Sequence, residues 1–298
     1  YRQILRSTSI IGGASIINIL IGLLRIKAAA VLLGPTGVGL IGLMTSLAST
    51  ASTVAGLGFG NVGTRQIAAA TGQSDSAAVA AARRALFWGT LVLSFLGASI
   101  FWALRDVLAQ RVLGGATFSS DAGWLSVAVG LTVASASQVA LLNGMRRVGD
   151  VARVSVLSSV FASVLGVAAL VIWGSSGLMI FVLAAPLASF LIGNIYIARL
   201  PKLRSPRTPL IQIADQWRIL ARLGFAFMVA GLAGTLGQLL VRVAVQKQLG
   251  PDSLGYFHAA YTISVTYVSL VLGSMASDYY PRVAAAIDDH AAVTRMIN

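Results

Sequence analysis

The chain carries an internal repeat, in which residues 2–70 match residues 218–286 at a constant offset of 216 positions. Without any gap, fifteen of the sixty-nine aligned residues are identical. The shared landmarks are an Arg-x-x-x-Arg start, a Leu-Gly-Pro sequence at Leu33–Pro35 and Leu249–Pro251, and the glycines Gly39 and Gly255. Long repeats in apolar chains are typical of transporter folds, in which two halves move around a site between them. The repeat predicts one unit in residues 1–217 and the start of a second.

Composition places the chain in a membrane. It is 57% hydrophobic and only 10% charged, with a mean hydropathy of +0.84, whereas soluble domains carry roughly 25% charged residues. It has no cysteine and no glutamate, which excludes disulfides and thiolate metal sites. The net charge of +13 comes from basic residues between apolar stretches, so membrane topology explains it better than nucleic-acid binding.

Eight apolar stretches approach the ~20 residues that cross a bilayer. The expected spans are residues 8–33, 38–70, 85–104, 124–145, 151–173, 178–200, 223–248 and 254–280, with a ninth starting near 290. We therefore expect an all-α polytopic membrane protein with one complete six-helix bundle and the first two to three helices of a second, repeat-related bundle that is truncated. The expected divisions are residues 1–200 for the first bundle, 201–222 for a basic loop and an interfacial amphipathic helix, and 223–298 for the incomplete second bundle.

Basic residues fall mainly on one side of this topology. With a cytoplasmic N-terminus, sixteen of the twenty-two Lys and Arg residues lie in cytoplasmic segments. This bias fits the positive-inside rule and predicts an N-in orientation.

Two expected helices carry polar stripes. The first has Asn18, Gly22 and Arg25 on one face, and the seventh has Gly234, Gln238 and Arg242. Polar side chains inside a membrane are costly and therefore mark candidate sites. If both stripes line one gap, it is cationic and suits an anionic, phosphate-bearing lipid, because guanidinium groups bind phosphate bidentately. The alternative is that Arg25 and Arg242 extend to outer headgroups.

His258 is a candidate for proton coupling, because histidine titrates near neutral pH; the alternative is an interfacial histidine near a helix end.

Catalysis is not expected. The chain has only two histidines, no Walker loop and no dinucleotide-binding context around Gly56-x-Gly58-x-Gly60. We expect neither a cofactor nor a metal.

Several short sequences resemble the polysaccharide-transport branch of the multidrug, oligosaccharidyl-lipid and polysaccharide exporter superfamily, and more closely its O-antigen translocases. They are Ile11–Ser15, Leu33–Leu40, Ala55–Gly60 with Arg65–Ala68, and Leu142–Arg153. The resemblance extends over essentially all 298 residues. It implies two six-helix bundles, a central cationic cavity and flipping of undecaprenyl-diphosphate-linked oligosaccharide to the outer leaflet.

On this basis we expect a lipid-linked oligosaccharide flippase of the bacterial cytoplasmic (inner) membrane that works by alternating access. Its partners would be the lipid-linked oligosaccharide, membrane lipids and other polysaccharide-assembly proteins, without nucleic acid. Three alternatives remain open: a lipid II flippase, a drug/cation exporter of the same superfamily, and a non-transporting scaffold in a polysaccharide-synthesis complex. The drug/cation exporter would need membrane-embedded carboxylates, and the first seven expected spans contain none.

Overall fold

The computed structural model describes the backbone of residues 2–73, 76–200, 210–265 and 268. These residues form helices joined by short turns, and none of them lies in a strand. The main helices are α1 (Arg2–Ala55), α2 (Phe59–Gly72), α3 (Ser76–Ala103), α4 (Arg105–Leu108), α5 (Ser119–Gly144), α6 (Val148–Trp173), α7 (Leu178–Ala198) and α8 (Leu210–Leu249). A π-turn at Ala109–Leu113 (η1), 3₁₀ turns at Ala116–Phe118 (η2) and Gly174–Gly177 (η3), and a helix over residues 251–265 complete the described chain. The expected all-helical fold is confirmed, and the ninth expected span lies outside the described residues.

Five helical stretches of the described chain are long and apolar enough to span a bilayer. They are Ile10–Ala55, Ala77–Ala103, Ala116–Gly144, Val148–Ala198 and Ala221–Leu249. Two of them have 46 and 51 residues, about twice the ~20 that one crossing needs. Each of these long stretches contains a sharp turn, at Gly34 and at Gly174–Gly177, so the five stretches accommodate seven crossings.

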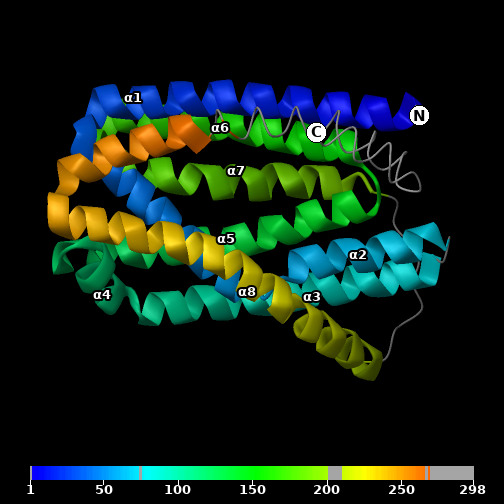
Figure 1. The fold of residues 1–298 in the computed structure, drawn as a ribbon. Coiled ribbons are helices and arrows are strands. Elements are labelled where there is room, and N and C mark those ends of the chain that lie inside the picture. Colours follow the sequence, from blue (N-terminus) through cyan, green and yellow to red (C-terminus); the bar gives the residue numbers. More distant parts are fainter. Residues whose placement is uncertain (1, 74–75, 201–209, 266–267, 269–298) are drawn as a thin grey trace, which may run out of the picture.

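The turn in α1 depends on Gly34, which has φ 70° and ψ −174°. Only glycine adopts this conformation without strain, and Pro35 then starts the second half of α1 with a φ that suits a first helical turn. The sequence predicted a loop here, but the two halves of α1 join directly. In Figure 1 the first half runs along one edge of the molecule and the second half returns diagonally through its centre. We call this end of the molecule the Gly34 end and the opposite one the Arg146 end.

The prediction that residues 38–70 form one helix is wrong, because two helices cover this range. α1 ends at Ala55, and α2 starts at Phe59 after Leu57 and Gly58, whose φ values are 44° and 66°. Gly58 lies against Gly224 of α8 so closely that a Cβ at position 58 would overlap the Gly224 carbonyl. The break is therefore a contact site for α8.

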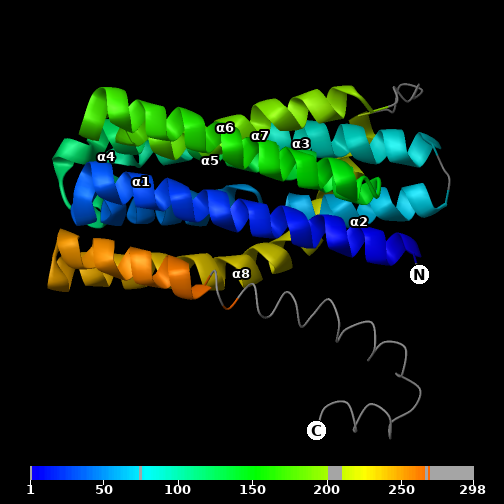
Figure 2. The same ribbon diagram turned by 90° about the horizontal axis from the view of Figure 1, so that it is seen from above.

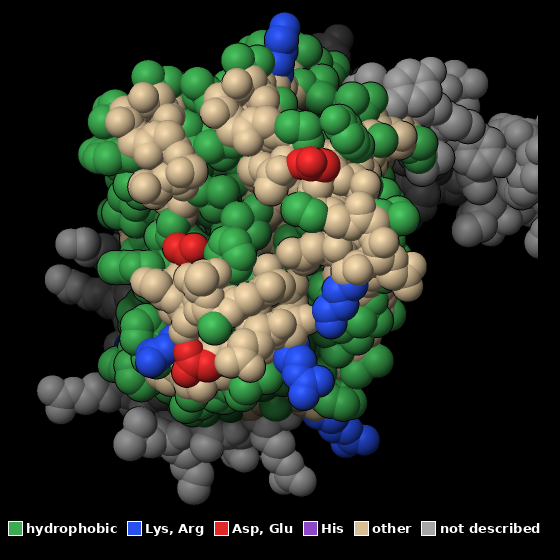
Figure 3. Space-filling model, turned by 90° about the vertical axis from the view of Figure 1, so that its left-hand side faces the viewer, with side chains coloured by type: hydrophobic (Ala, Val, Ile, Leu, Met, Phe, Trp, Pro, Cys, Tyr) green, Lys and Arg blue, Asp and Glu red, His purple; other side chains and the backbone are tan. Residues whose placement is uncertain are grey.

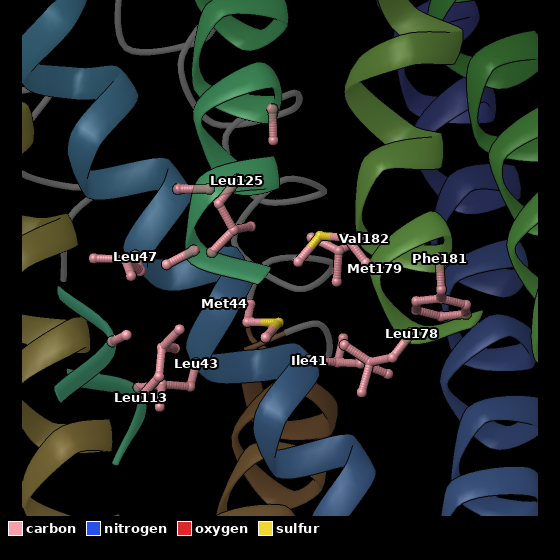
Figure 4. Packing of buried hydrophobic residues seen from close by; sticks show 14 of the residues in the cluster. Ile41, Leu43, Met44, Leu47, Leu113, Leu125, Leu178, Met179, Phe181 and Val182 are labelled. Atoms are coloured by element: carbon pink, nitrogen blue, oxygen red, sulfur yellow. The ribbon is translucent and has the colours of Figure 1, made fainter. Parts of the chain in front are cut away.

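The second half of α1 is the centre of the largest apolar cluster. Leu43 and Met44 are fully buried there, among residues of α5, α7 and the η1 turn. Figure 4 shows Leu43 facing Leu113 and Ile41 facing Leu178. This buried segment serves as the packing surface for the rest of the first bundle, because helices from both sides contact it.

α8 lies outside this bundle, on one side of it together with residues 251–265 (Figure 2). It is one helix of 40 residues, roughly 60 Å long at ~1.5 Å per residue. Residues 210–222, which we expected to form a separate interfacial helix, are therefore continuous with the expected seventh span. Near the Arg146 end, the Trp217 indole N–H donates to the carbonyl of Ala85 in α3 at 3.0 Å. This bond and the Gly58–Gly224 contact attach α8 to the first bundle.

Candidate functional site

The two repeat units meet through residues that occupy the same position in each unit. At the Gly34 end, the Thr36 hydroxyl donates a hydrogen bond to the Asp252 carboxylate, and these residues are 216 positions apart. Gly39 packs against Gly255, and Gly42 packs against the ring of His258, again at the repeat offset. In a two-fold arrangement, a residue touches its own equivalent only on the axis. These three pairs define the line along which the two repeat units meet, which we call the repeat axis.

Glycine is required at this axis in both units. A Cβ on Gly255 would overlap the Pro35 carbonyl, and a Cβ on Gly39 would lie 2.8 Å from the Gly255 backbone nitrogen. Cβ contacts this short do not occur in stable packing. Both repeat units therefore keep glycine at this position, Gly39 and Gly255, because the two backbones touch there.

Arg242 lies immediately beside this axis and is buried, with 4% of its surface exposed. Its guanidinium lies 5.0 Å from the ring centroid of Tyr261, and it donates to the side chain of Gln238 over a long 3.5 Å. His258, which is also buried, is the residue that packs against Gly42. The Nε atom of Arg242 and the Nδ1 atom of His258 are buried without a hydrogen-bond partner among the described residues. The unused Nε donor of Arg242 is suited to an anion once the surrounding contacts open, and the unpartnered Nδ1 atom of His258 lies in the same group.

The first unit places its candidate residues differently. Arg25 lies 4.1 Å from the ring centroid of Phe181 in α7, and its guanidinium donates to the Phe181 carbonyl. Asn18 donates from Nδ2 to the Ser155 hydroxyl of α6 at 2.7 Å. Both residues therefore face helices of their own bundle.

The structure brings Gln238, Arg242 and His258 together, and it places Asn18 and Arg25 elsewhere. Among the described residues, no hydrogen bond or ring contact joins the two groups. The alternative in which Arg242 extends to lipid headgroups does not fit its burial. The prediction that Arg25 and Arg242 share one ligand stays a prediction.

Sequence analysis overlooked a cavity of about 440 Å³ between α2, α5, α6 and α7, in which polar side chains interrupt a mainly apolar lining. Its polar lining consists of Asn61, Thr64, Thr132, Ser135, Asn143, Ser155 and Ser189. Ser155 is the partner of Asn18, so the first polar stripe ends at this cavity. The helical spacing of Thr132, Ser135 and Asn143 was a signal that could have revealed it.

A solved structure described as "Inward-facing conformation of a multidrug resistance MATE family transporter of the MOP superfamily" has the same fold, with a TM-score of 0.69 and 18% sequence identity. The match covers 93% of this chain and 64% of that chain, so our chain spans about two thirds of its length. No curated protein sequence matches. The sequence model of the family described as "Polysaccharide biosynthesis protein" matches residues 4–286, nearly the whole chain. The chain is therefore a multi-pass membrane protein that belongs to the polysaccharide biosynthesis protein family.

Proposed function

We propose that this protein flips a lipid-linked oligosaccharide, carried on undecaprenyl diphosphate, from the inner to the outer leaflet of the bacterial cytoplasmic membrane. The observation that carries the proposal is the contact between equivalent residues of the two repeat units, Thr36 with Asp252 and Gly42 with His258. Such a contact closes one end of the space between two bundles, as alternating access requires. Membership of a polysaccharide biosynthesis family supports a polysaccharide-related substrate.

Charge supports a cytoplasmic N-terminus. The basic side chains described at the Arg146 end are Arg65, Arg83, Arg84, Arg146, Arg147, Arg153, Arg199 and Arg222. At the Gly34 end, acidic side chains lie among the basic ones (Figure 3), and Asp106 and Asp121 stand in the first turns of α4 and α5. Since basic residues concentrate in cytoplasmic segments, we assign the Arg146 end to the cytoplasm and the Gly34 end to the outside.

This orientation is testable with cysteine labelling, because the natural chain contains no thiol. A cysteine replacing Thr36 should react with a membrane-impermeant maleimide added to intact cells. A cysteine replacing Arg153, whose side chain is 69% exposed at the Arg146 end, should react only after the membrane is permeabilised. Outside labelling of Arg153→Cys in intact cells would reverse the orientation.

In the proposed cycle, the structure represents a form closed on the outside. The diphosphate binds at Arg242, with Gln238 positioning the guanidinium, and Arg25 supplies a second cation from the first bundle. The neutral hydroxyls and amides of the cavity beside Asn18 suit the hydroxyl groups of a sugar head. Opening the contact between Gly42 and His258 would uncover Arg242 to the outside and release the head group there. His258 is placed to respond to this opening and is our candidate for energy coupling.

A drug/cation antiporter of the same superfamily is less well supported. The acidic side chains described in the structure are Asp106, Asp121, Asp150 and Asp252, and each lies at a helix end or in its first turns. None of these carboxylates lies at the middle of a described span, where a cation carrier would need one.

The direct test is translocation in vesicles. Full-length protein reconstituted with a fluorescent undecaprenyl-diphosphate oligosaccharide should move the label between leaflets, detected by a glycosidase or a quencher added outside. Vesicles containing the protein denatured before reconstitution serve as the control. No translocation above that control under a proton, sodium or potential gradient would contradict the proposed function.

A further inference from the structure

A second, larger cavity lies away from the axis between the repeat units. It is a groove of about 890 Å³ between α3, α5 and α7, and none of its lining residues belongs to α1 or α8. Along α3 it extends from Ala80 to Ala98, roughly 27 Å at ~1.5 Å per residue. The groove is therefore separate from the candidate transport site and nearly as long as the ~30 Å hydrocarbon core.

The two ends of the groove differ chemically. Arg83 and Arg84 line it at the Arg146 end, where α3 begins. Beyond them, the α3 wall consists of Phe87, Leu91 and Phe95, whose exposed fractions are 61%, 50% and 73%. A cationic end followed by an exposed apolar wall matches a molecule with an anionic head and a hydrocarbon chain.

Two buried polar side chains in the groove point to a ligand that is polar at this depth. Thr90 and Gln138 are 4% and 6% exposed, and the Thr90 Oγ1 and Gln138 Oε1 atoms are buried without a partner among the described residues. Buried polar atoms are nearly always hydrogen-bonded in folded proteins. Thr90, whose hydroxyl can donate, lies between the two arginines and the far apolar end, where the ester carbonyls of a lipid would follow its phosphate.

We propose that this groove is a binding site for one anionic phospholipid of the inner leaflet. Its phosphate lies at Arg83 and Arg84, an ester carbonyl accepts a hydrogen bond from the Thr90 hydroxyl, and an acyl chain lies along Phe87, Leu91 and Phe95. The transported lipid does not fit this site equally well. Its diphosphate must cross the membrane, whereas the groove has cations at only one end. The site would hold a resident lipid that connects α3, α5 and α7.

The test measures binding of spin-labelled phosphatidylglycerol and spin-labelled phosphatidylcholine to the full chain in vesicles. The wild-type protein should immobilise phosphatidylglycerol preferentially. In Arg83→Ala/Arg84→Ala this preference should fall about thirtyfold, equivalent to about 2 kcal/mol at about 1.4 kcal/mol per tenfold, because each arginine near an anionic headgroup contributes. The control Arg65→Ala/Arg153→Ala removes two charges at the same end from residues that do not line the groove, and it should keep the preference.

A second variant tests the apolar part of the groove. Ala134→Trp fills it without changing charge, and it should reduce the immobilised fraction of both labelled lipids. An unchanged preference in Arg83→Ala/Arg84→Ala, or an equal loss in the control, would refute the site. Displacement of the labelled lipid by undecaprenyl phosphate at lower concentration than by unlabelled phosphatidylglycerol would assign the groove to the transported lipid instead. Since these measurements require no translocation, their result is independent of the proposed function.

Discussion

Arg242→Ala is expected to reduce translocation of the lipid-linked oligosaccharide at least about 100-fold while the protein still reaches the membrane. The reason is that a bidentate arginine–phosphate contact comprises two charge-assisted hydrogen bonds, each worth about 1.5–3 kcal/mol. The two side chains that contact the Arg242 guanidinium, Gln238 and Tyr261, carry no positive charge that could replace it. Arg242→Lys should retain part of the activity, because lysine keeps the charge but lacks the planar fork. The measurement is the vesicle translocation rate, normalised to the amount of folded protein.

A structural role for Arg242 must be separated from a role in binding. Arg105→Ala is a matched control, since Arg105 also lies over an aromatic ring, at 4.6 Å from Trp102, but on the surface. It should leave translocation unchanged. Tyr261→Leu removes the ring beneath the Arg242 guanidinium and leaves the charge in place. If Arg242 only packs, Tyr261→Leu should be as damaging as Arg242→Ala. A wild-type translocation rate in Arg242→Ala would exclude Arg242 from substrate binding.

Most of the helical fold was predictable because its signals are local. The Gly34-Pro35 and Gly174–Gly177 turns followed from the special backbone freedom of glycine and the fixed φ of proline. The break at residues 56–58 was missed because the sequence remains apolar and helical in pattern on both sides of it. The glycines at 56 and 58 permit the break, but the close approach of Gly224, which fixes it there, involves a residue that is distant in the chain and outside any short sequence window.

The candidate site was predictable only within single helices. Spacing placed Gln238 beside Arg242, and the structure shows that these two side chains contact each other. The ring partners Phe181 and Tyr261 were not predicted, because a polar stripe defines a helix face but not the helix opposite it. The 216-residue offset also indicates which residues of the two repeat units touch each other. A glycine preserved at one position in both units, Gly39 and Gly255, is a signal for contact at the repeat axis.

Cross-linking the two repeat units at that axis should abolish transport. In Thr36→Cys/Asp252→Cys, the new thiols replace side chains that are already in hydrogen-bonding contact, so oxidation or a short bifunctional maleimide should join them. If the outer side must open in each cycle, a covalent bond there reduces translocation to the level of protein-free vesicles. Reduction of the disulfide should restore it, which distinguishes locking from misfolding.

The first bundle offers a control of the same chemistry at the same end. The Ser119 hydroxyl donates to the Asp106 carboxylate, as Thr36 does to Asp252, but both residues belong to one repeat unit. Ser119→Cys/Asp106→Cys should cross-link equally well and leave translocation nearly unchanged, because no relative movement of the units is blocked. Each single cysteine should likewise be active under oxidation. Full translocation by quantitatively cross-linked Thr36→Cys/Asp252→Cys would show that the contact stays closed during transport. The two units would then have to pass the head group without separating at their axis, and Arg242 would have no route to the outside.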